Sequence, residues 1–463
     1  MTMWTPDLRQ RSGPRYIAIA EALAEDAGGG RLRPGTRLPT HRDLADRLGV
    51  TVGTITRAYA EATRRGLVTG EVGRGTFVRA AARPAAVAAA PEAGLIDLSA
   101  NLPPAAAVKQ EAATLARTLA ALSRRKDLGR LLAYPPEGGA REHRAAGAEW
   151  IRRGGFATTV ERVLVTSGSQ HGMTAVFAGL FAPGDVIATE ALTYPGMKTL
   201  AGLLALRLQG VAMDEHGLRP DAFAAACRAR RPKALYCVPT LQNPTTAVMP
   251  AARRQEIAAI ARDHGVLIVE DDVHGRLLAR PHAPLSTFAP DNSVYVTGTS
   301  KVLAPGLRVG FIVAPPALSP RIAAAIRGTT WMAAPLMAEI ASRWIQDGTA
   351  ETILARKRKE AAARYRIARR ALERFAIQAH PEAYHLWLAL PKPWRAESYV
   401  EAARRAGVAV TAASAFAVGR GAAPEAVRVC LGGARDQDEL GRGVARLAAL
   451  LAGSPEAPVA SGP

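Results

Sequence analysis

Hydrophobic residues in the first eighty positions recur at the spacing of short helices. Residues 15–26 carry apolar side chains at helical intervals and are followed by three glycines. Two further helical segments each begin after a threonine, Thr40 or Thr51, whose hydroxyl suits an N-cap. Residues 67–69 and 76–78, rich in β-branched side chains, then flank a glycine-containing turn. The pattern predicts three helices followed by a β-hairpin.

From residue 95 onward, short runs rich in β-branched residues alternate with longer amphipathic segments. The strand-like runs are residues 162–166, 186–189, 234–238, 266–269, 294–297 and 309–314, and the helical segments include residues 171–180, 221–228 and 251–264. This alternation predicts an α/β domain with a mostly parallel sheet and crossover helices. In such sheets the ligand binds beyond the carboxyl ends of the strands, so polar residues that follow the strands are the candidates for chemistry.

Low-complexity segments divide the chain. Residues 80–94 are rich in alanine and proline, and residues 453–463 form a similar low-complexity segment. Neither has a core-forming pattern, so we expect a linker and a disordered tail. The remainder forms an N-terminal domain at 13–79 and a large domain at 95–452. Within the large domain, we expect a smaller C-terminal α/β subdomain from about residue 330.

Composition indicates a globular protein and limits its location. Hydrophobic residues make up 48% of the 463 positions, yet no apolar run reaches the roughly 20 residues that span a bilayer. The N-terminus lacks the order of a signal peptide. The three cysteines, Cys227, Cys237 and Cys430, are too scattered for a zinc pattern. We therefore expect a cytoplasmic protein with no bound metal and no membrane contact.

The charge is compatible with a polyanionic partner. The chain has a formal net charge of +20, and residues 1–79 contain thirteen arginines and no lysine against eight acidic residues. Two short helices joined by a tight turn, followed by a hairpin with a basic tip, are typical of a winged helix-turn-helix that binds double-stranded DNA. The alternative is a small helical cap on an enzyme, with its arginines merely solvated.

If the N-terminal domain binds DNA, its contacts lie near the start of the third helix and on the hairpin. Short hydroxyl and guanidinium side chains there are able to reach base edges, and other residues are placed for phosphate or groove contacts. The expected DNA-contacting residues are Thr40, Arg42, Thr51, Thr54, Arg57 and Arg74.

A lysine follows the fifth strand-like run of the large domain. Lys301 comes after small hydroxyl residues, and Arg308 follows seven positions later. A desolvated lysine forms Schiff bases with aldehydes, and the nearby hydroxyls and guanidinium suit a phosphate. Together they indicate pyridoxal 5'-phosphate. The alternative for this stretch alone is a loop lysine between two core strands.

Polar residues also follow the other strand-like runs. A turn ending in Ser169 opens a helix and has the free N–H groups of an anion site, Asn243 lies in a loop, and Asp271 belongs to an acidic cluster. Each is ordinary turn chemistry when taken alone. Their common position at strand ends, with Lys301, favours a functional site.

Two stretches of the sequence resemble known families. Residues 35–45, 48–51 and 73–78 closely resemble the DNA-binding domain of GntR-family regulators, although Thr51-Val52 replaces the Ser-Arg that the family commonly has. The order and composition of residues 95–450 resemble the fold type I aminotransferases. The combination resembles the MocR-type branch of GntR regulators.

The resemblance implies definite roles around the cofactor ring. Lys301 would carry the Schiff base, Asp271 would pair with the pyridine nitrogen, and Asn243 would bond the 3-hydroxyl oxygen. Tyr194 would stack on the ring. His274 stands where related aminotransferases usually have the tyrosine that assists the 3-oxygen.

The resemblance also implies a phosphate site, a partner subunit and an effector. Tyr134 resembles the tyrosine that reaches the phosphate of the partner subunit, which implies a homodimer. Arg428 resembles the arginine that clamps a substrate carboxylate. The remaining phosphate-binding residues would be Ser169, Gln170, Ser300 and Arg308, with the backbone N–H of Gly168.

Three functions are compatible with these features. The favoured one is a transcriptional regulator that binds a DNA operator and senses a small-molecule amine or amino-acid effector through its cofactor at Lys301. The second is a working aminotransferase that carries an appended helical domain. The third is a DNA-binding scaffold whose large domain only dimerises, which the retained Lys301, Asp271, Asn243 and Arg308 disfavour.

Overall fold

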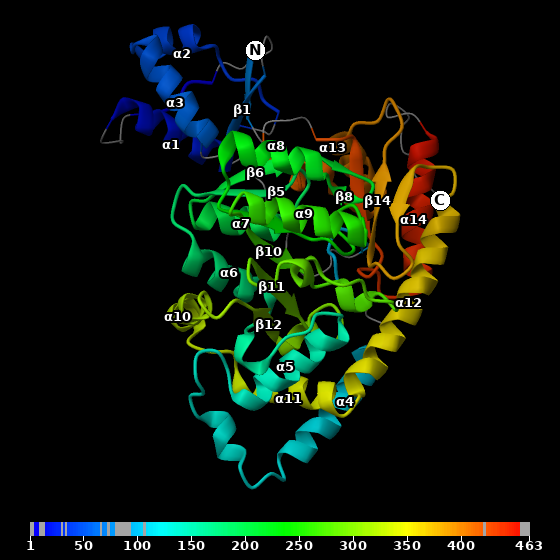
Figure 1. Cartoon of the computed structure of the whole chain (residues 1–463). Helices are drawn as coiled ribbons and strands as arrows, with labels where there is room; N and C mark the ends of the chain where they lie inside the picture. Colours follow the sequence, from blue (N-terminus) through cyan, green and yellow to red (C-terminus); the bar gives the residue numbers. More distant parts are fainter. Residues whose placement is uncertain are drawn as a thin grey trace. The chain divides into compact units, whose positions relative to one another are not determined.

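The computed structural model describes residues 4–8, 14–28, 31–32, 35–64, 67–71, 75–78, 94–104, 108–419 and 423–453 (Figure 1). The chain forms two compact units, Met1–Val87 and Ala88–Pro463. Among the described residues, no helix is both long enough and apolar enough to cross a bilayer. Most of the expected linker, the hairpin tip and most of the expected C-terminal tail lie outside the described residues.

The N-terminal unit contains the expected three helices and hairpin. Its elements are α1 (Arg15–Gly28), α2 (His41–Leu48), α3 (Val52–Arg64), β1 (Val68–Glu71) and β2 (Gly75–Val78), and the two strands pair antiparallel. Ile19, Leu23, Leu44 and Ile55 are fully buried in one core. Leu23, Leu44 and Ile55 lie on the helical faces that the spacing predicts, whereas the spacing placed Ile17, which is only half-buried, on the core face of α1 and missed Ile19.

The turn between α2 and α3 follows from its caps. The Thr40 hydroxyl accepts a hydrogen bond from the backbone N–H of Asp43 at 3.2 Å. Gly49 has φ of +63°, a left-handed conformation that ends α2. Thr51 accepts from the N–H of Thr54 at 3.2 Å and so caps α3. The two threonines therefore act as the N-caps that the sequence predicts.

The larger unit is built on a seven-stranded sheet with the order β4-β12-β11-β10-β9-β5-β6. The strands are β4 (Val163–Thr166), β12 (Gly310–Val313), β11 (Ser293–Gly298), β10 (Leu267–Asp271), β9 (Ala234–Cys237), β5 (Val186–Glu190) and β6 (Arg207–Val211). Only β12 runs antiparallel to its neighbours, which confirms the mostly parallel sheet. Six strands match the expected runs within a few residues. The pattern missed β6, whose edge position tolerates polar and glycine residues such as Arg207 and Gly210.

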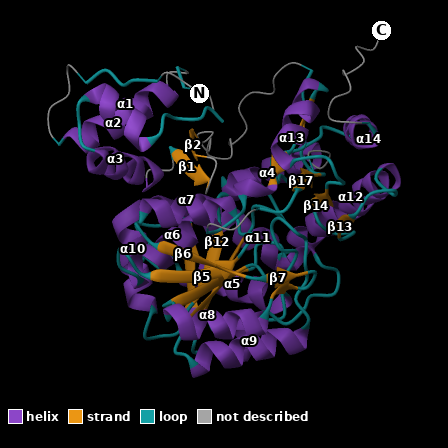
Figure 2. Ribbon diagram, turned by 90° about the horizontal axis from the view of Figure 1, so that it is seen from above, coloured by secondary structure: helices purple, strands orange, loops and turns teal. Residues whose placement is uncertain are grey.

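Helices cover both faces of this sheet (Figure 2). Val269 of β10 packs in the cluster that contains α6 and α10, while its neighbour Ile268 packs in the cluster that contains α8 and α9. This division follows from the alternation of side chains along a strand. The covering helices are α5 (Arg141–Arg153), α6 (Ser169–Leu180), α7 (Pro195–Leu203), α8 (Pro220–Arg230), α9 (Ala251–Asp263), α10 (Ser319–Thr330) and α11 (Pro335–Gln346).

The last third of the chain forms a smaller four-stranded sheet with the order β13-β14-β17-β16. The strands are β13 (Ile377–Ala379), β14 (His385–Ala389), β17 (Ala426–Cys430) and β16 (Thr411–Ala412), and the associated helices are α12 (Thr349–Ala371), α13 (Ala396–Arg405) and α14 (Gln437–Ala452). The pair of β3 (Ile96–Asp97) and β15 (Val408–Ala409) joins the beginning of this unit to its end. The segment that leads from β3 to α4 (Val108–Leu122) therefore starts next to the C-terminal sheet.

Candidate cofactor site and DNA-contacting surface

A cradle for an anion forms at the N-terminus of α6. Gly168 precedes this helix with φ of +87° and ψ of 165°. The Arg308 guanidinium donates to Ser300 Oγ at 3.0 Å and to the Ser167 carbonyl at 3.4 Å, which holds it against the turn. A Cβ atom on Gly168 would lie 2.5 Å from Arg308 Nη2. The glycine thus brings a helix N-terminus, a guanidinium and a hydroxyl close together, as a phosphate requires.

Lys301 lies three residues beyond the end of β11. Its Nζ donates to the Asn101 carbonyl, and Tyr384 Oη donates to the Lys301 carbonyl at 3.0 Å. Desolvation lowers the pKa of Lys301 to about 8, and the positive charges of Arg428 and Arg308 act in the same direction, against opposing effects of Cys430 and Asp271. A substantial fraction of this amine is therefore neutral near physiological pH and able to react with an aldehyde.

Asp271 ends β10 with one carboxylate oxygen bonded and one free. Tyr236 Oη donates to Oδ2 at 2.8 Å, whereas Oδ1 is buried without a hydrogen-bond partner among the described residues. Burial raises the pKa of Asp271 to about 6, and the bond from Tyr236, the backbone N–H of Val273 and the charge of Lys301 oppose this rise. A buried acceptor without a donor is costly, so the site fits a ligand that brings an N–H, such as a protonated pyridine ring.

Glu190 is a second buried acid in this region, and it has a different environment. Its Oε1 accepts from the Val238 N–H at 2.8 Å, and burial raises its pKa to about 8, with Asp271 contributing. Glu190 is therefore largely protonated at neutral pH, so Asp271 carries the negative charge. Sequence reasoning missed Glu190, although an acid at the end of a buried strand is a signal that could have found it.

Asn243 and Arg428 lie in direct contact. Arg428 Nη1 donates to Asn243 Oδ1 at 2.8 Å, and Nη2 donates to the Ser99 carbonyl at 2.6 Å. The guanidinium also stacks 4.7 Å from the centroid of the Phe416 ring. Because the carboxamide oxygen of Asn243 faces a donor, its amide N–H groups remain for a ligand oxygen. Arg428 Nε is buried without a partner in the described chain.

Tyr194 stands at the start of α7 and folds back over Gly196. A Cβ on Gly196 would lie 2.3 Å from the tyrosine ring, so the glycine provides the space that the ring fills. Burial raises the pKa of the Tyr194 phenol, which therefore stays neutral. A neutral aromatic ring held by the backbone is suited to stacking.

The other expected site residues lie in three places. Ser169 and Gln170 begin α6 beside Gly168, and Gln170 Oε1 is buried without a partner in the described chain. His274 is buried next to Asn101, a residue that sequence reasoning did not select. Tyr134 is 77% exposed and packs against Trp331, with ring centroids 5.8 Å apart. An exposed tyrosine at this position is compatible with a role in a partner subunit.

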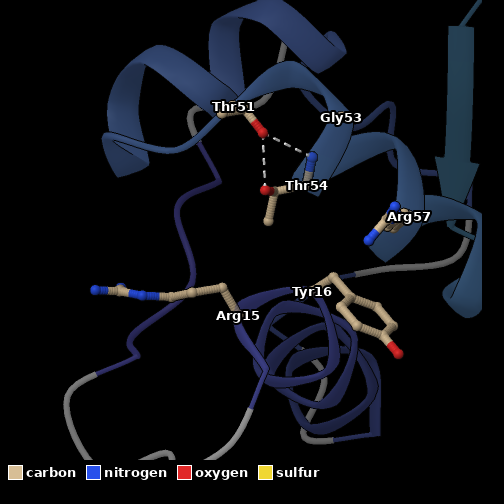
Figure 3. A pocket seen from close by; sticks show the side chains of 6 residues that line it. All are labelled: Arg15, Tyr16, Thr51, Gly53, Thr54 and Arg57. Atoms are coloured by element: carbon tan, nitrogen blue, oxygen red, sulfur yellow. Dashed lines mark hydrogen bonds between the residues drawn. The ribbon is translucent and has the colours of Figure 1, made fainter.

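The N-terminal unit has a polar hollow of about 330 Å³ between α1 and α3 (Figure 3). Thr51 Oγ1 and Thr54 Oγ1 are 3.0 Å apart at the start of α3, and Arg57 follows one turn later. Arg15 and Tyr16 of α1 line the opposite side, and sequence reasoning did not select them. The hollow thus brings together three of the expected DNA-contacting residues.

The other residues expected to contact DNA have different positions. Thr40 caps α2, and Arg42 lies in its first turn. Arg74 lies outside the described residues. Val52, which stands where the GntR family commonly has arginine, is 43% exposed at the start of α3.

Comparison with known proteins agrees with both halves of the chain. The family "Aminotransferase class I and II" matches residues 93–447, and the family "Bacterial regulatory proteins, gntR family" matches residues 15–78. The uncharacterized HTH-type transcriptional regulator YdeF of Bacillus subtilis is 31% identical over 450 residues, which cover 97% of this chain and 96% of YdeF. The pyridoxine biosynthesis transcriptional regulator PdxR of Corynebacterium glutamicum is 27% identical over 321 residues, covering 67% and 68% of the two chains.

A solved structure shares the fold of the larger unit. The crystal structure of the α-aminoadipate aminotransferase LysN from Thermus thermophilus, complexed with N-(5'-phosphopyridoxyl)-L-leucine, has a TM-score of 0.68 and 28% identity. The similarity covers 78% of this chain and 92% of LysN. Fold and site together define an aminotransferase-like domain of fold type I that depends on pyridoxal 5'-phosphate.

The chain belongs to the MocR-type branch of the GntR family, in which a gntR-type helix-turn-helix is fused to an aminotransferase class I and II domain. A helix-turn-helix of this family implies DNA binding, and an aminotransferase-like domain suggests an amino-acid effector.

Proposed function

We propose that this protein is a DNA-binding transcriptional regulator that senses an amine or amino acid through pyridoxal phosphate bound at Lys301. One observation carries the proposal. Lys301, with a pKa of about 8, and Asp271, with an unpartnered carboxylate oxygen, share one site in a chain that also carries a helix-turn-helix. Lys301 is suited to react with an aldehyde, Asp271 is suited to pair with a ring nitrogen, and the helix-turn-helix is suited to bind a DNA operator.

The residues of the site have separate tasks in holding the cofactor. Lys301 would provide the amine for covalent attachment, Asp271 would pair with the ring nitrogen, Asn243 would donate to the 3-oxygen, and Tyr194 would stack on the ring. The phosphate is held by Ser169, Gln170, Ser300, Arg308 and the N–H of Gly168. When bound, pyridoxal phosphate supplies an aldehyde that exchanges amines and a ring that accepts electrons.

Arg428 indicates that the effector carries a second functional group besides its amine. Its guanidinium is held by Asn243, Ser99 and Phe416, which orients a bidentate donor in the cofactor site. A carboxylate is the complementary group for such a donor. An amino acid, which carries both an amine and a carboxylate, is therefore the effector that this site fits.

An effector changes DNA affinity only if it interacts differently with two states of the protein. In the free protein, Lys301 Nζ is engaged with the Asn101 carbonyl. With the cofactor bound, an effector amine would compete with Lys301 for the aldehyde, which would release this side chain and alter the charges beside Asp271 and Arg428. This exchange is the differential interaction through which the effector shifts the DNA-bound state.

The regulator acts as a homodimer in this proposal. Tyr134 reaches the phosphate of the partner subunit, and the exposure of Tyr134 and of Leu132, at 77% and 88%, supports a covered surface there. A two-fold dimer presents two winged helices to two operator half-sites. Molecular mass in solution tests this part directly, and a monomer at micromolar concentration would contradict it.

A working aminotransferase is the second candidate, and the retention of Lys301, Asp271 and Asn243 favours it. Incubating the loaded protein with a panel of amino acids and a keto acid separates the two functions. A regulator gives absorbance changes that saturate with the amine, with no more product than protein. Sustained formation of product in excess of protein would identify the enzyme instead.

DNA binding is tested by gel shift with the protein's own upstream region. Arg42→Ala and Arg57→Ala should each weaken binding and reduce its dependence on salt concentration. Exposed Arg152 of α5, outside the N-terminal unit, provides a matched control. Equal retention by all of these variants would contradict recognition through the winged helix.

A further inference from the structure

Three side chains from distant parts of the sequence form an unexpected array beside Lys301. Asn101 Nδ2 lies 3.5 Å from His274 Nε2 and 3.4 Å from His385 Nδ1. Both imidazoles are almost completely buried, and their ring centroids are 5.9 Å apart. The backbone carbonyl of the same Asn101 accepts from Lys301 Nζ. The array is therefore part of the surroundings of the reactive lysine.

The proton on His385 is fixed by a backbone carbonyl. Its Nε2 lies 3.0 Å from the Gln242 carbonyl oxygen, which only accepts hydrogen bonds, so Nε2 carries a proton. Burial lowers the pKa of His385 to about 3, and the positive charges of Arg428 and Lys301 act in the same direction. The ring is consequently neutral. Its Nδ1 has a free lone pair and needs a donor.

The orientation of the Asn101 amide determines which nitrogen of His274 accepts a hydrogen bond. Its N–H₂ group must face His385 Nδ1, because the carboxamide oxygen would oppose a lone pair there. The second N–H of the same group then faces His274 Nε2, which therefore accepts. Desolvation lowers the pKa of His274 well below its usual range. The neighbouring His385, Lys301 and Arg428 lower this pKa further, whereas the Leu241 backbone, which lies near the ring as a hydrogen-bond partner, raises it.

A neutral His274 that accepts at Nε2 carries its proton on Nδ1. That nitrogen is buried and makes no well-aligned hydrogen bond among the described residues, although the Leu241 backbone lies near the ring. The chain thus holds an oriented N–H donor without a well-aligned acceptor, in a position where related aminotransferases usually have a tyrosine hydroxyl. A buried donor of this kind is costly unless a ligand supplies the acceptor.

We propose that Asn101 and His385 are positioning residues that lock His274 in the neutral tautomer with its proton on Nδ1, so that this N–H donates to the 3-oxygen of the bound cofactor. The proposal rests on the proposed function, since it requires pyridoxal phosphate in this site. A neutral imidazole N–H is a far weaker acid than a phenol. His274 therefore holds a proton in place and does not pass it on, which suits sensing better than turnover.

The first test is the pH dependence of the visible absorbance of the loaded full-length protein. Donation to the 3-oxygen stabilises its ionised form, so His274→Phe should raise the midpoint of the absorbance change by about one to two pH units. Asn101→Ala and His385→Phe should raise it by about half a unit, because His274 then samples both tautomers. Asn101→Asp offers only acceptors and should reverse the tautomer, with a shift close to that of His274→Phe.

Asn292→Ala is the matched control for Asn101→Ala. It removes a half-buried amide that donates to the Val266 carbonyl at 2.9 Å, at the beginning of β10 and away from Lys301. This variant should leave the midpoint unchanged. An unchanged midpoint in His274→Phe would overturn the proposal, as would equal shifts in Asn101→Ala and Asn292→Ala.

A second measurement needs no cofactor and no activity. In cofactor-free protein with ¹⁵N-labelled histidine, the His274 resonances should have the chemical shifts of a neutral ring protonated on Nδ1. The Asn101→Asp variant, which preserves the size of the side chain, should move the proton to Nε2. A His274 resonance of the Nε2–H form in the wild type would overturn the proposal.

The tautomer of His274 and the function of the cofactor site can be tested separately. If the wild-type protein takes up pyridoxal phosphate at Lys301 and the His274 variants leave the titration unchanged, only the tautomer proposal is wrong. If the wild-type protein gives no Lys301-dependent absorbance band, the proposed function itself is wrong. The histidine spectrum of the cofactor-free protein remains interpretable in either case.

Discussion

Gly168→Ala separates binding of the cofactor phosphate from stability of the fold. A Cβ at this position would lie 2.5 Å from Arg308 Nη2 and 2.9 Å from its Cζ. The guanidinium is the end of a flexible side chain, so it is displaced and the turn is kept. We expect Arg308 to lose its hydrogen bond to Ser300, which is 3.0 Å long, and with it the orientation that the phosphate needs.

The size of the effect follows from these contacts. The backbone of Gly168, with φ of +87° and ψ of 165°, belongs to a region that other residues enter at a cost of about 1–3 kcal/mol. This cost lowers the free energy of unfolding. A hydrogen bond to a charged group contributes about 1.5–3 kcal/mol, and because Arg308 is exposed we take the lower half. Affinity for pyridoxal phosphate should therefore fall roughly 10- to 50-fold.

Gly184→Ala is the matched control, since Gly184 has φ of +91° but no atom within 4 Å of an added Cβ. Both variants should lose stability in thermal unfolding of the cofactor-free protein. Only Gly168→Ala should weaken equilibrium binding of pyridoxal phosphate, followed by absorbance. Equal affinities in the two variants would refute the assignment of Arg308 to the phosphate site.

Three further predictions concern single groups. Formation of the covalent complex should accelerate as pH rises through about 8, where Lys301 loses its proton; a midpoint near the ordinary 10.5 would contradict desolvation of this lysine. Affinity for pyridoxal phosphate should fall as pH drops through about 6, where Asp271 gains a proton. Tyr236→Phe removes the hydrogen bond that lowers the pKa of Asp271. The pH limit below which cofactor affinity falls should therefore rise by about one unit. Tyr295→Phe, which removes the matching bond to Asp272, should leave that limit unchanged. Thr40→Ala removes an N-cap and should cost the N-terminal unit about 1 kcal/mol in thermal unfolding, and no loss would contradict the capping role.

The sequence predicted six of the seven strands of the large sheet and placed the candidate ligand-binding residues at strand ends. Buried parallel strands read as continuous apolar runs, so β9, β10 and β11 were visible, and the residues that end or follow them include Asn243, Asp271 and Lys301. The edge strand β6 was missed because one side of an edge strand does not need apolar residues.

The histidine array could not be predicted in this way. Asn101 is 173 residues from His274 and 284 residues from His385, so only the tertiary fold brings the three side chains together. Tyr236 lies within a strand, where a tyrosine reads as an ordinary core residue, and its bond to Asp271 depends on the pairing of β9 with β10. Hydrophobic patterns in the sequence identify where strands end, whereas contacts between elements can be predicted only when the pairing register of the strands is known.

The central claim is that an amine bound at Lys301 changes binding to DNA. The most direct measurement titrates the loaded full-length protein with amino acids while recording its visible absorbance and its affinity for its upstream DNA. The account predicts that both signals change over the same concentration range for one amino acid, and that Lys301→Ala abolishes both responses. A change in absorbance with no change in DNA affinity for any amino acid would contradict the account.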